Sequence, residues 1–198
     1  MQDEVKRITR QTLLNKIAGI RSTRDQALIA FIYLTGCRIS EVLGETKHIK
    51  KRDKETKEVI EVKDVIVQPL IKEDIEKIGE DIILVKNVPC LKRRAKVPTR
   101  DIPLKISSDK DFIKIFLEHY NKVPNGEALF KITRQRAWQI INKELGVFNH
   151  FLIHQRCTEL VRHKQFTDIY LKMFRGWKDT RPAEIYTHLN WQDLANKL

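Results

Sequence analysis

The sequence predicts an α+β fold, a mainly helical domain that contains a small antiparallel β-sheet. With 198 residues, of which 41% are hydrophobic, the chain suits one domain with its own core. Both ends of the chain show the spacing of amphipathic or buried helices. The middle, from residue 46 to about 105, is instead dense in charged and β-branched residues, and Pro89, Pro98 and Pro103 exclude a long helix there. We therefore expect helices that surround a small sheet.

Three helices are expected before the sheet. The first begins at a capping Thr9 and runs to about residue 18, where a glycine follows. The second begins at a capping Ser22 or Thr23, ends at Gly36 and is apolar on all sides over residues 27–34. Such a helix is buried in a core rather than lying at the surface. The third is the short amphipathic stretch CRISEVLGE.

The sheet and the remaining helices follow from the same reasoning. Strand-like segments are HIKKRDKETKEVIEVKDVIV, DIILVKNV and KVPTRDIPL, which would form one antiparallel sheet with loops at its lysine-rich ends. Helices are then expected at about 110–121, 133–145, 151–163, 168–174 and 182–188, and the last nine residues, NWQDLANKL, form a tail.

The charge of the chain favours a polyanionic partner. Lys and Arg number 38 against 26 Asp and Glu, a net charge of +12, and nucleic acid is the most frequent partner of such a surface. No apolar run approaches the roughly 20 residues of a membrane span, and the N-terminus lacks the apolar core of a signal peptide. Cys37, Cys90 and Cys157 are widely spaced and form no CxxC motif, which is typical of reduced thiols. We therefore expect a cytoplasmic protein.

The first chemically informative segment is TGCRISEVLGE. Arg38 stands at the start of a helix, where its guanidinium can bind a phosphate, and Glu41 at i+3 can hold it in place. The alternative is an ordinary Arg–Glu pair at the surface.

The second segment is VKNVPCLKRRAKVPTRDIPL, a β-ribbon whose charge fits contact with the DNA backbone or groove. The alternative is a solvated charged loop. Its basic residues are Lys86, Lys92, Arg93, Arg94, Lys96 and Arg100.

The third segment, RGWKDTRPAEIYTHLNW, places Tyr186 nine residues after Trp177. A tyrosine can act as a covalent nucleophile when cations neutralise the group that it attacks, although a packing role is the simpler interpretation. In the stretch HFLIH, His150 and His154 are four residues apart, a spacing that can hold zinc on one helix face.

Taken together and in this order, TGxRxxE, a basic β-hairpin ending in VPTRDIPL, the HFLIH box, and GW followed by IYTHL resemble the catalytic domain of tyrosine recombinases, the phage-integrase family. The resemblance runs from about Ile8 to Trp191, and its ending is most similar to archaeal integrases of mobile elements. It implies that a tyrosine attacks a DNA phosphate and leaves a 3′-phosphotyrosyl link and a free 5′-hydroxyl. It also implies that the reaction needs no metal and no cofactor.

By this resemblance, Tyr186 is the nucleophile and Arg38 is the first of two phosphate-clamping arginines. Trp177 occupies the place of a histidine or tryptophan whose ring nitrogen donates to a phosphate oxygen. Lys92 is the expected general acid, with Lys86 as the second choice. Arg93, Arg94, Lys96 and Arg100 would contact the DNA.

The HFLIH box departs from the family. His150 matches the box histidine, but Ile153 stands where the second arginine is expected, and His154 would serve helix packing. One preorganised donor to a transition-state oxygen is worth roughly 10²–10³ in rate, so we expect cleavage to be slowed at least about a hundredfold. Arg156, one helical turn further on, is the alternative source of the guanidinium.

Two functions therefore remain open, a DNA strand transferase of reduced activity and a DNA-binding module that does not cut. A metal-dependent nuclease is a third, and the HFLIH pair is its only support in the sequence. The expected domain is a single catalytic domain, residues 1–198, without the N-terminal DNA-clamping domain usual in the family. We further expect double-stranded DNA as partner and association with the nucleoid. Two oligomeric states remain open, a tetrameric synapse on DNA in which residues 190–198 are exchanged between protomers, and a free monomer.

Overall fold

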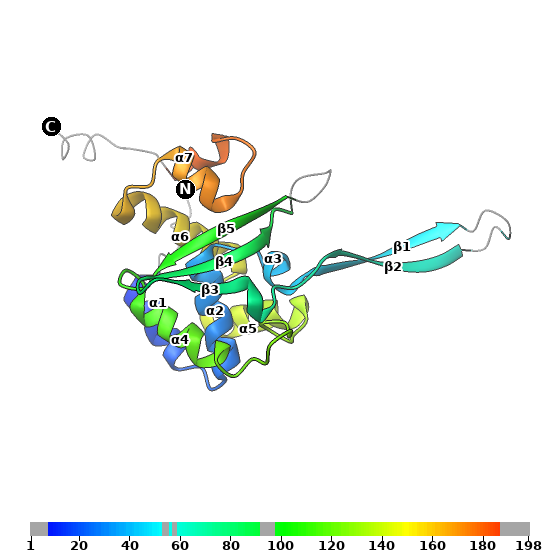
Figure 1. Ribbon diagram of the computed structural model, residues 1–198, viewed down its shortest axis with the longest axis horizontal. Coiled ribbons are helices and arrows are strands. Elements are labelled where there is room, and N and C mark those ends of the chain that lie inside the picture. Colours follow the sequence, from blue (N-terminus) through cyan, green and yellow to red (C-terminus); the bar gives the residue numbers. More distant parts are fainter. Residues whose placement is uncertain (1–7, 53–55, 57–58, 92–97, 187–198) are drawn as a thin grey trace.

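The computed structural model describes residues 8–52, 56, 59–91 and 98–186, and within them the predicted α+β fold is confirmed. Helices form the body of the molecule, and strands occupy the middle of the chain (Figure 1). The order of helices, strands and further helices is the order that the sequence predicts.

The three N-terminal helices form where they were expected. They are α1 (Arg10–Ala18), α2 (Thr23–Thr35) and α3 (Ile39–Leu43). The side chain of Thr9 accepts a hydrogen bond from the amide of Thr12, and that of Ser22 accepts one from the amide of Asp25. These are N-caps, which satisfy backbone donors that the first turn of a helix leaves without a partner.

The strands form two sheets, whereas the sequence predicted one. β1 (Glu45–Arg52) and β2 (Val59–Val67) make an antiparallel hairpin that projects from the body (Figure 1). β3 (Ile75–Ile78), β4 (Ile82–Pro89) and β5 (Thr99–Lys105) form a separate antiparallel sheet in the order β3-β4-β5. The segment after β2 explains the separation, because the Leu70 amide donates to Val42 O and the Leu70 carbonyl accepts from the Leu129 amide. The chain is thus fastened to the helical body before β3 begins.

Four longer helices follow, close to their predicted positions: α4 (Lys110–Tyr120), α5 (Arg134–Leu145), α6 (Asn149–Lys164) and α7 (Asp168–Arg175). Short 3₁₀ turns are present at η1 (Lys72–Asp74) and η2 (Arg181–Ala183). A helix was predicted at 182–188. The structure describes residues 182–186 of this range, and for them the prediction is wrong, because only the 3₁₀ turn η2 forms. The predicted tail lies outside the described residues.

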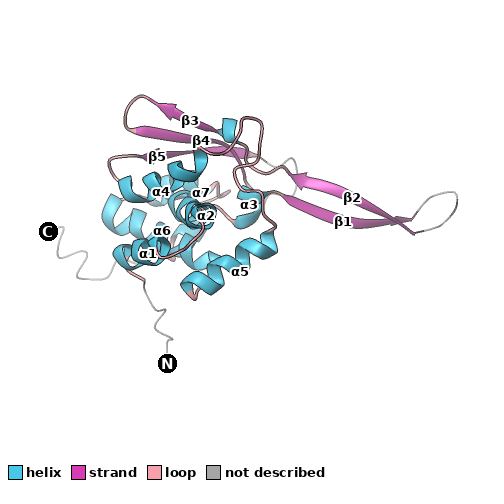
Figure 2. Ribbon diagram, turned by 90° about the horizontal axis from the view of Figure 1, so that it is seen from below, coloured by secondary structure: helices cyan, strands magenta, loops and turns pink. Residues whose placement is uncertain are grey.

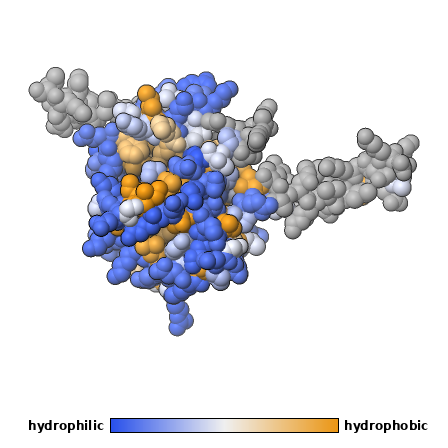
Figure 3. Space-filling view, in the orientation of Figure 1, coloured by the Kyte–Doolittle hydropathy of each residue, from blue (hydrophilic) through white to orange (hydrophobic). Residues whose placement is uncertain are grey.

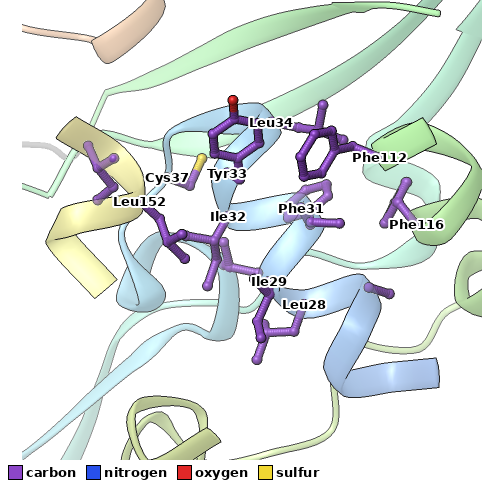
Figure 4. Packing of buried hydrophobic residues seen from close by; sticks show 14 of the residues in the cluster. Leu28, Ile29, Phe31, Ile32, Tyr33, Leu34, Cys37, Phe112, Phe116 and Leu152 are labelled. Carbon is purple, nitrogen blue, oxygen red and sulfur yellow. The ribbon is translucent and has the colours of Figure 1, made fainter. Parts of the chain in front are cut away.

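The core is built around α2, whose residues 27–34 are all buried, as predicted. The Phe31 ring lies 4.9 Å from that of Phe116, and the Tyr33 ring lies 4.6 Å from that of Phe112, centroid to centroid, while Leu152 approaches from α6 (Figure 4). The sheet β3-β4-β5 covers one side of these helices (Figure 2). Such dense packing holds the ends of these helices in fixed positions.

The outer surface is mainly hydrophilic, and on the face shown in Figure 3 hydrophobic side chains form only small, separate patches. Among the residues that the structure describes, no helix has the length and apolar character needed to cross a membrane. Cys37, Cys90 and Cys157 are buried free thiols.

Candidate active site

The first part of the site is the turn between α2 and α3. Gly36 ends α2 with a left-handed backbone, φ +60°. A Cβ at this position would lie 3.1 Å from the Phe174 ring and 3.4 Å from Nη1 of Arg175. The glycine therefore allows the end of α7 to approach the start of α3, where Arg38 is the N-cap residue.

Glu41 joins two arginines from distant parts of the chain. Nη1 of Arg38 donates to Oε1 of Glu41 at 2.6 Å, and Nη2 of Arg100 donates to Oε2 at 3.1 Å. The carboxylate is 0% exposed. Burial raises the pKa of Glu41, but the charge of Arg100 and the amide and charge of Arg38 outweigh burial and hold that pKa below its usual value. The carboxylate stays ionised and orients the Arg38 guanidinium.

Arg100 is placed in the interior, whereas the sequence predicted that it contacts DNA. Its Nε donates to the carbonyl oxygen of Phe174 at 2.9 Å, and its Nη atoms lie beside the sulfurs of Cys90 and Cys37. The alternation of buried and exposed residues along β5 turns Arg100 inward. In the described structure this arginine fastens α7 to the sheet and supports Glu41.

The second part of the site surrounds Tyr186. Its hydroxyl oxygen lies 2.6 Å from Nδ1 of His154, and its ring stacks on Trp177 with the centroids 6.2 Å apart and the planes 14° apart. Burial and the neighbouring Cys157 raise the pKa of Tyr186, and the charge of Arg175 opposes this increase. The phenol is therefore neutral near pH 7, and His154 is placed to receive its proton.

His154 and Arg175 are the two site residues that sequence reasoning missed. His154 was expected to pack within α6, but it is exposed and contacts Tyr186. Partial burial and the charge of Arg175 lower the pKa of His154, which keeps the imidazole neutral. The HFLIH spacing already drew attention to this histidine. Arg175 lies directly before the GW motif, and its guanidinium carbon lies 5.8 Å from the ring centre of Trp177.

His150 and Arg38 line one cleft of about 1080 Å³, together with Arg134 and Trp138. His154 and Tyr186 line a neighbouring pocket of about 750 Å³. The structure thus groups Arg38 with Glu41 and Arg100, and groups Tyr186 with His154 and Trp177.

Ile153 is 3% exposed and belongs to the hydrophobic core. Arg156, proposed from sequence as a substitute for the missing arginine, donates from both Nη atoms to Asp109, at 3.1 and 2.8 Å. Nη1 also donates to Glu159 at 3.0 Å, and Arg10 binds the same two carboxylates. This buried network joins α1, α4 and α6 and already occupies the Arg156 guanidinium.

The basic residues of the β4–β5 ribbon are only partly described. Lys86 on β4 pairs with Glu76 on β3 at 2.9 Å, and this carboxylate raises the pKa of Lys86. Lys92, Arg93, Arg94 and Lys96 lie outside the described residues.

Across the described part of the chain, no three His, Cys, Asp or Glu side chains gather as a metal site would require.

Gly176 supplies a test of the close packing at the site. Its φ is +63°, and a Cβ there would overlap Cys90 Sγ and lie 2.9 Å from Cδ of Arg100. The left-handed conformation alone costs a non-glycine residue about 1–2 kcal/mol, so Gly176→Ala should lower the melting temperature by more than Gly146→Ala. Gly146 has φ +70° but nothing within 4 Å, and equal losses in the two variants would contradict the close approach.

Comparisons with known proteins show the fold. No family model matches this chain, and no curated protein matches it. The XerH site-specific recombinase bound to difH substrate, in a pre-cleavage complex, aligns with TM-score 0.61 and 18% identity over 93% of this chain and 50% of that chain. XerA recombinase aligns with TM-score 0.55 and 18% identity over 93% and 60%.

The integrase of transposon Tn1549, in complex with circular intermediate DNA, aligns with TM-score 0.55 and 15% identity over all of this chain and 66% of that chain. This chain thus spans half the length of the XerH protein and under two thirds of XerA. The structural similarity establishes a recombinase-type α+β fold, the fold that the motif order indicates.

Proposed function

We propose that this chain is the catalytic domain of a site-specific DNA recombinase or integrase, which cuts and rejoins double-stranded DNA through a 3′-phosphotyrosine intermediate. The observation that carries the proposal is the arrangement around Tyr186, whose hydroxyl meets His154 and whose ring stacks on Trp177. The net charge of +12 and the DNA-bound recombinase and integrase of the same fold support DNA as the partner. A tetrameric synapse and an archaeal mobile element remain proposals from the sequence motifs.

The proposed reaction exchanges one phosphodiester for another. Tyr186 Oη forms a bond to the scissile phosphorus, its proton passes to Nδ1 of His154, and the bond to the 5′-oxygen breaks. Arg38 and the Trp177 ring nitrogen bind the phosphate oxygens, whose charge grows in the transition state. Lys92, by the family resemblance, gives a proton to the leaving 5′-oxygen, and Arg93, Arg94 and Lys96 bind the DNA backbone. Attack by a 5′-hydroxyl reverses each transfer, so the bond energy is conserved.

Arg38→Ala should slow formation of the covalent adduct by about 10²–10³-fold, because a preorganised donor to the phosphate is lost. Glu41 would still pair with Arg100, so the fold should persist. Single-turnover kinetics on nicked duplexes measure the rate, and circular dichroism measures the melting temperature. Arg24→Ala is the matched control, because Arg24 pairs with Asp25 at the start of α2. Equal rates in the two variants would remove Arg38 from the site.

The rate of adduct formation should be nearly constant between pH 8 and 6.5 and fall below that range. Protonated Nδ1 cannot accept the proton of Tyr186, and burial and Arg175 place the pKa of His154 below its usual 6.5. The same shift means that protonating His154 weakens folding as the pH falls below 6.5. His154→Gln should remove this acid-side decline. An unchanged decline in His154→Gln, with the protein folded at each pH, would exclude His154 as the proton acceptor.

The decisive experiment for the proposed function is capture of a protein–DNA adduct. Purified protein is incubated, in parallel with Mg²⁺ and with EDTA, with labelled duplexes of randomised sequence, each nicked so that the short 5′-hydroxyl fragment dissociates after cleavage. Adducts that survive denaturing electrophoresis support the recombinase, and sequencing the trapped DNA identifies the target. The burial of Ile153, where the second arginine is expected, favours one competing function, a DNA-binding module that does not cut. That module would bind the duplexes without an adduct, and cleavage that EDTA abolishes would indicate a metal-dependent nuclease.

A further inference from the structure

Arg175, the last residue of α7, is a buried cation without adequate protein partners. It is 4% exposed, and its Nε and Nη1 have no hydrogen-bond partner among the described residues. Burying charged donors without partners is costly, because they lose water and gain nothing in return. A bound anion would supply the missing partners, and the guanidinium is shaped to bind a phosphate with two parallel hydrogen bonds.

The guanidinium of Arg175 lies between the two groups of site residues. On one side, Nη1 comes close to Gly36, and the Arg175 charge contributes to the lowered pKa of Glu41. On the other side, it lies 5.8 Å from the centre of the Trp177 ring. The same charge lowers the pKa of His154 and opposes the increase in that of Tyr186. No other arginine acts on both of these pKa values in the described structure.

Arg175 also lies near the place of the arginine that the family pattern expects at position 153, where this chain has Ile153. Cys157 is buried on α6, and the charge of Arg175 acts against the rise that burial imposes on its pKa. Ile153 is four residues before Cys157, so the two side chains share one face of α6. Arg175 thus approaches, from α7, the face of α6 from which an arginine at position 153 would project.

The charges at this place favour an anion. The charges of Arg38 and Arg100 both act on Arg175, and all three guanidinium groups interact with the single carboxylate of Glu41. Three positive charges and one negative charge leave a formal charge of +2. Arg156, the other arginine near α6, pairs with Asp109 and Glu159 instead.

We propose that Arg175 is the second phosphate-clamping arginine, so that the guanidinium which Ile153 lacks is supplied from the end of α7. The proposal rests on the proposed function and deepens it. The ligand is the scissile phosphodiester, and Arg175 donates to one of its non-bridging oxygens. With this substitute in place, the domain cuts DNA despite Ile153.

The test compares Arg175→Met with Arg24→Met in the adduct assay on nicked duplexes. We expect Arg175→Met to lower the rate of adduct formation at least about a hundredfold, since one donor to the transition state is lost, whereas Arg24→Met keeps the wild-type rate. The melting temperature of free Arg175→Met should be unchanged or higher, because an unpaired buried charge is replaced by an apolar chain. A purely structural arginine would instead lower it.

Restoring the family position provides the complementary variant. The double substitution Ile153→Arg/Arg175→Met should regain at least about tenfold of the lost rate, because the donor returns from α6. Arg175→Lys keeps the charge without the two-pronged geometry, should fold like the wild type, and should fall between wild type and Arg175→Met. This variant decides the matter if Arg175→Met does not fold.

A second readout does not depend on cleavage. Inorganic phosphate, titrated at constant ionic strength, should raise the melting temperature of the wild type and of Arg24→Met, and should not raise that of Arg175→Met. Full cleavage by Arg175→Met, with an adduct that requires Tyr186, would overturn this inference and leave the proposed function intact. If the wild type forms no adduct, the proposed function fails, and equal phosphate shifts in wild type and Arg175→Met would overturn the anion site as well.

Discussion

Tyr186→Phe should abolish the covalent protein–DNA adduct and leave DNA affinity within about threefold of wild type, a difference of under 1 kcal/mol. The substitution removes the one atom that attacks phosphorus and keeps the ring that stacks on Trp177. It also removes the hydrogen bond to His154, which at this partly exposed position is worth about 1 kcal/mol of folding free energy. Denaturing electrophoresis measures the adduct, and fluorescence anisotropy with a labelled duplex measures affinity.

Tyr170→Phe is the control for this substitution. Tyr170 lies on α7 and is 58% exposed, so its hydroxyl can be removed without disturbing the core. Adducts should form at the wild-type rate in this variant. An adduct that persists in Tyr186→Phe but disappears in Tyr170→Phe would place the nucleophile outside the group around His154 and Trp177.

Glu41→Ala should destabilise the protein by about 3–5 kcal/mol, because it leaves the buried guanidinium of Arg100 without its carboxylate. For a chain of this size, that loss corresponds to a fall in melting temperature of roughly 6–20 °C. The effect should be larger than that of any exposed ion pair, since Glu41 has no access to water. Thermal unfolding followed by circular dichroism measures it.

Glu127→Ala serves as the comparison, because Glu127 forms an exposed i,i+4 pair with Lys131. Such pairs are worth about 0.3–0.5 kcal/mol. Because the pKa of Glu41 is lowered in the folded state, its contribution is present above pH 4.5 and is lost as the pH falls through the folded pKa. Similar melting temperatures for the two variants at pH 7 would show that the pairs of Glu41 add little to stability.

Much of the fold could be predicted because its signals are local. The capping Thr9 and Ser22 and the left-handed Gly36 fix the helix ends through contacts within a few residues. The division of the strands into two sheets could not be predicted in this way. It depends on hydrogen bonds that join Leu70 to Val42 and to Leu129, which are distant in sequence.

The candidate site shows the same limit. The motif order locates Arg38, Trp177 and Tyr186, but it does not tell which way a basic side chain points. Arg100 alternates in phase with the buried Ile102 and Leu104, a signal that could have placed it inside. Arg175 had no such signal, because its position depends on the contact of α7 with the turn at Gly36.

The most direct test of the proposed mechanism is to identify the residue to which the DNA is linked. Trapped adduct is digested with nuclease and protease, and mass spectrometry identifies the peptide that carries the nucleotide remnant. We expect a 3′-nucleotide linked to the oxygen of Tyr186. A remnant on any other residue, or DNA binding without a remnant under conditions that trap every cleavage event, would contradict it.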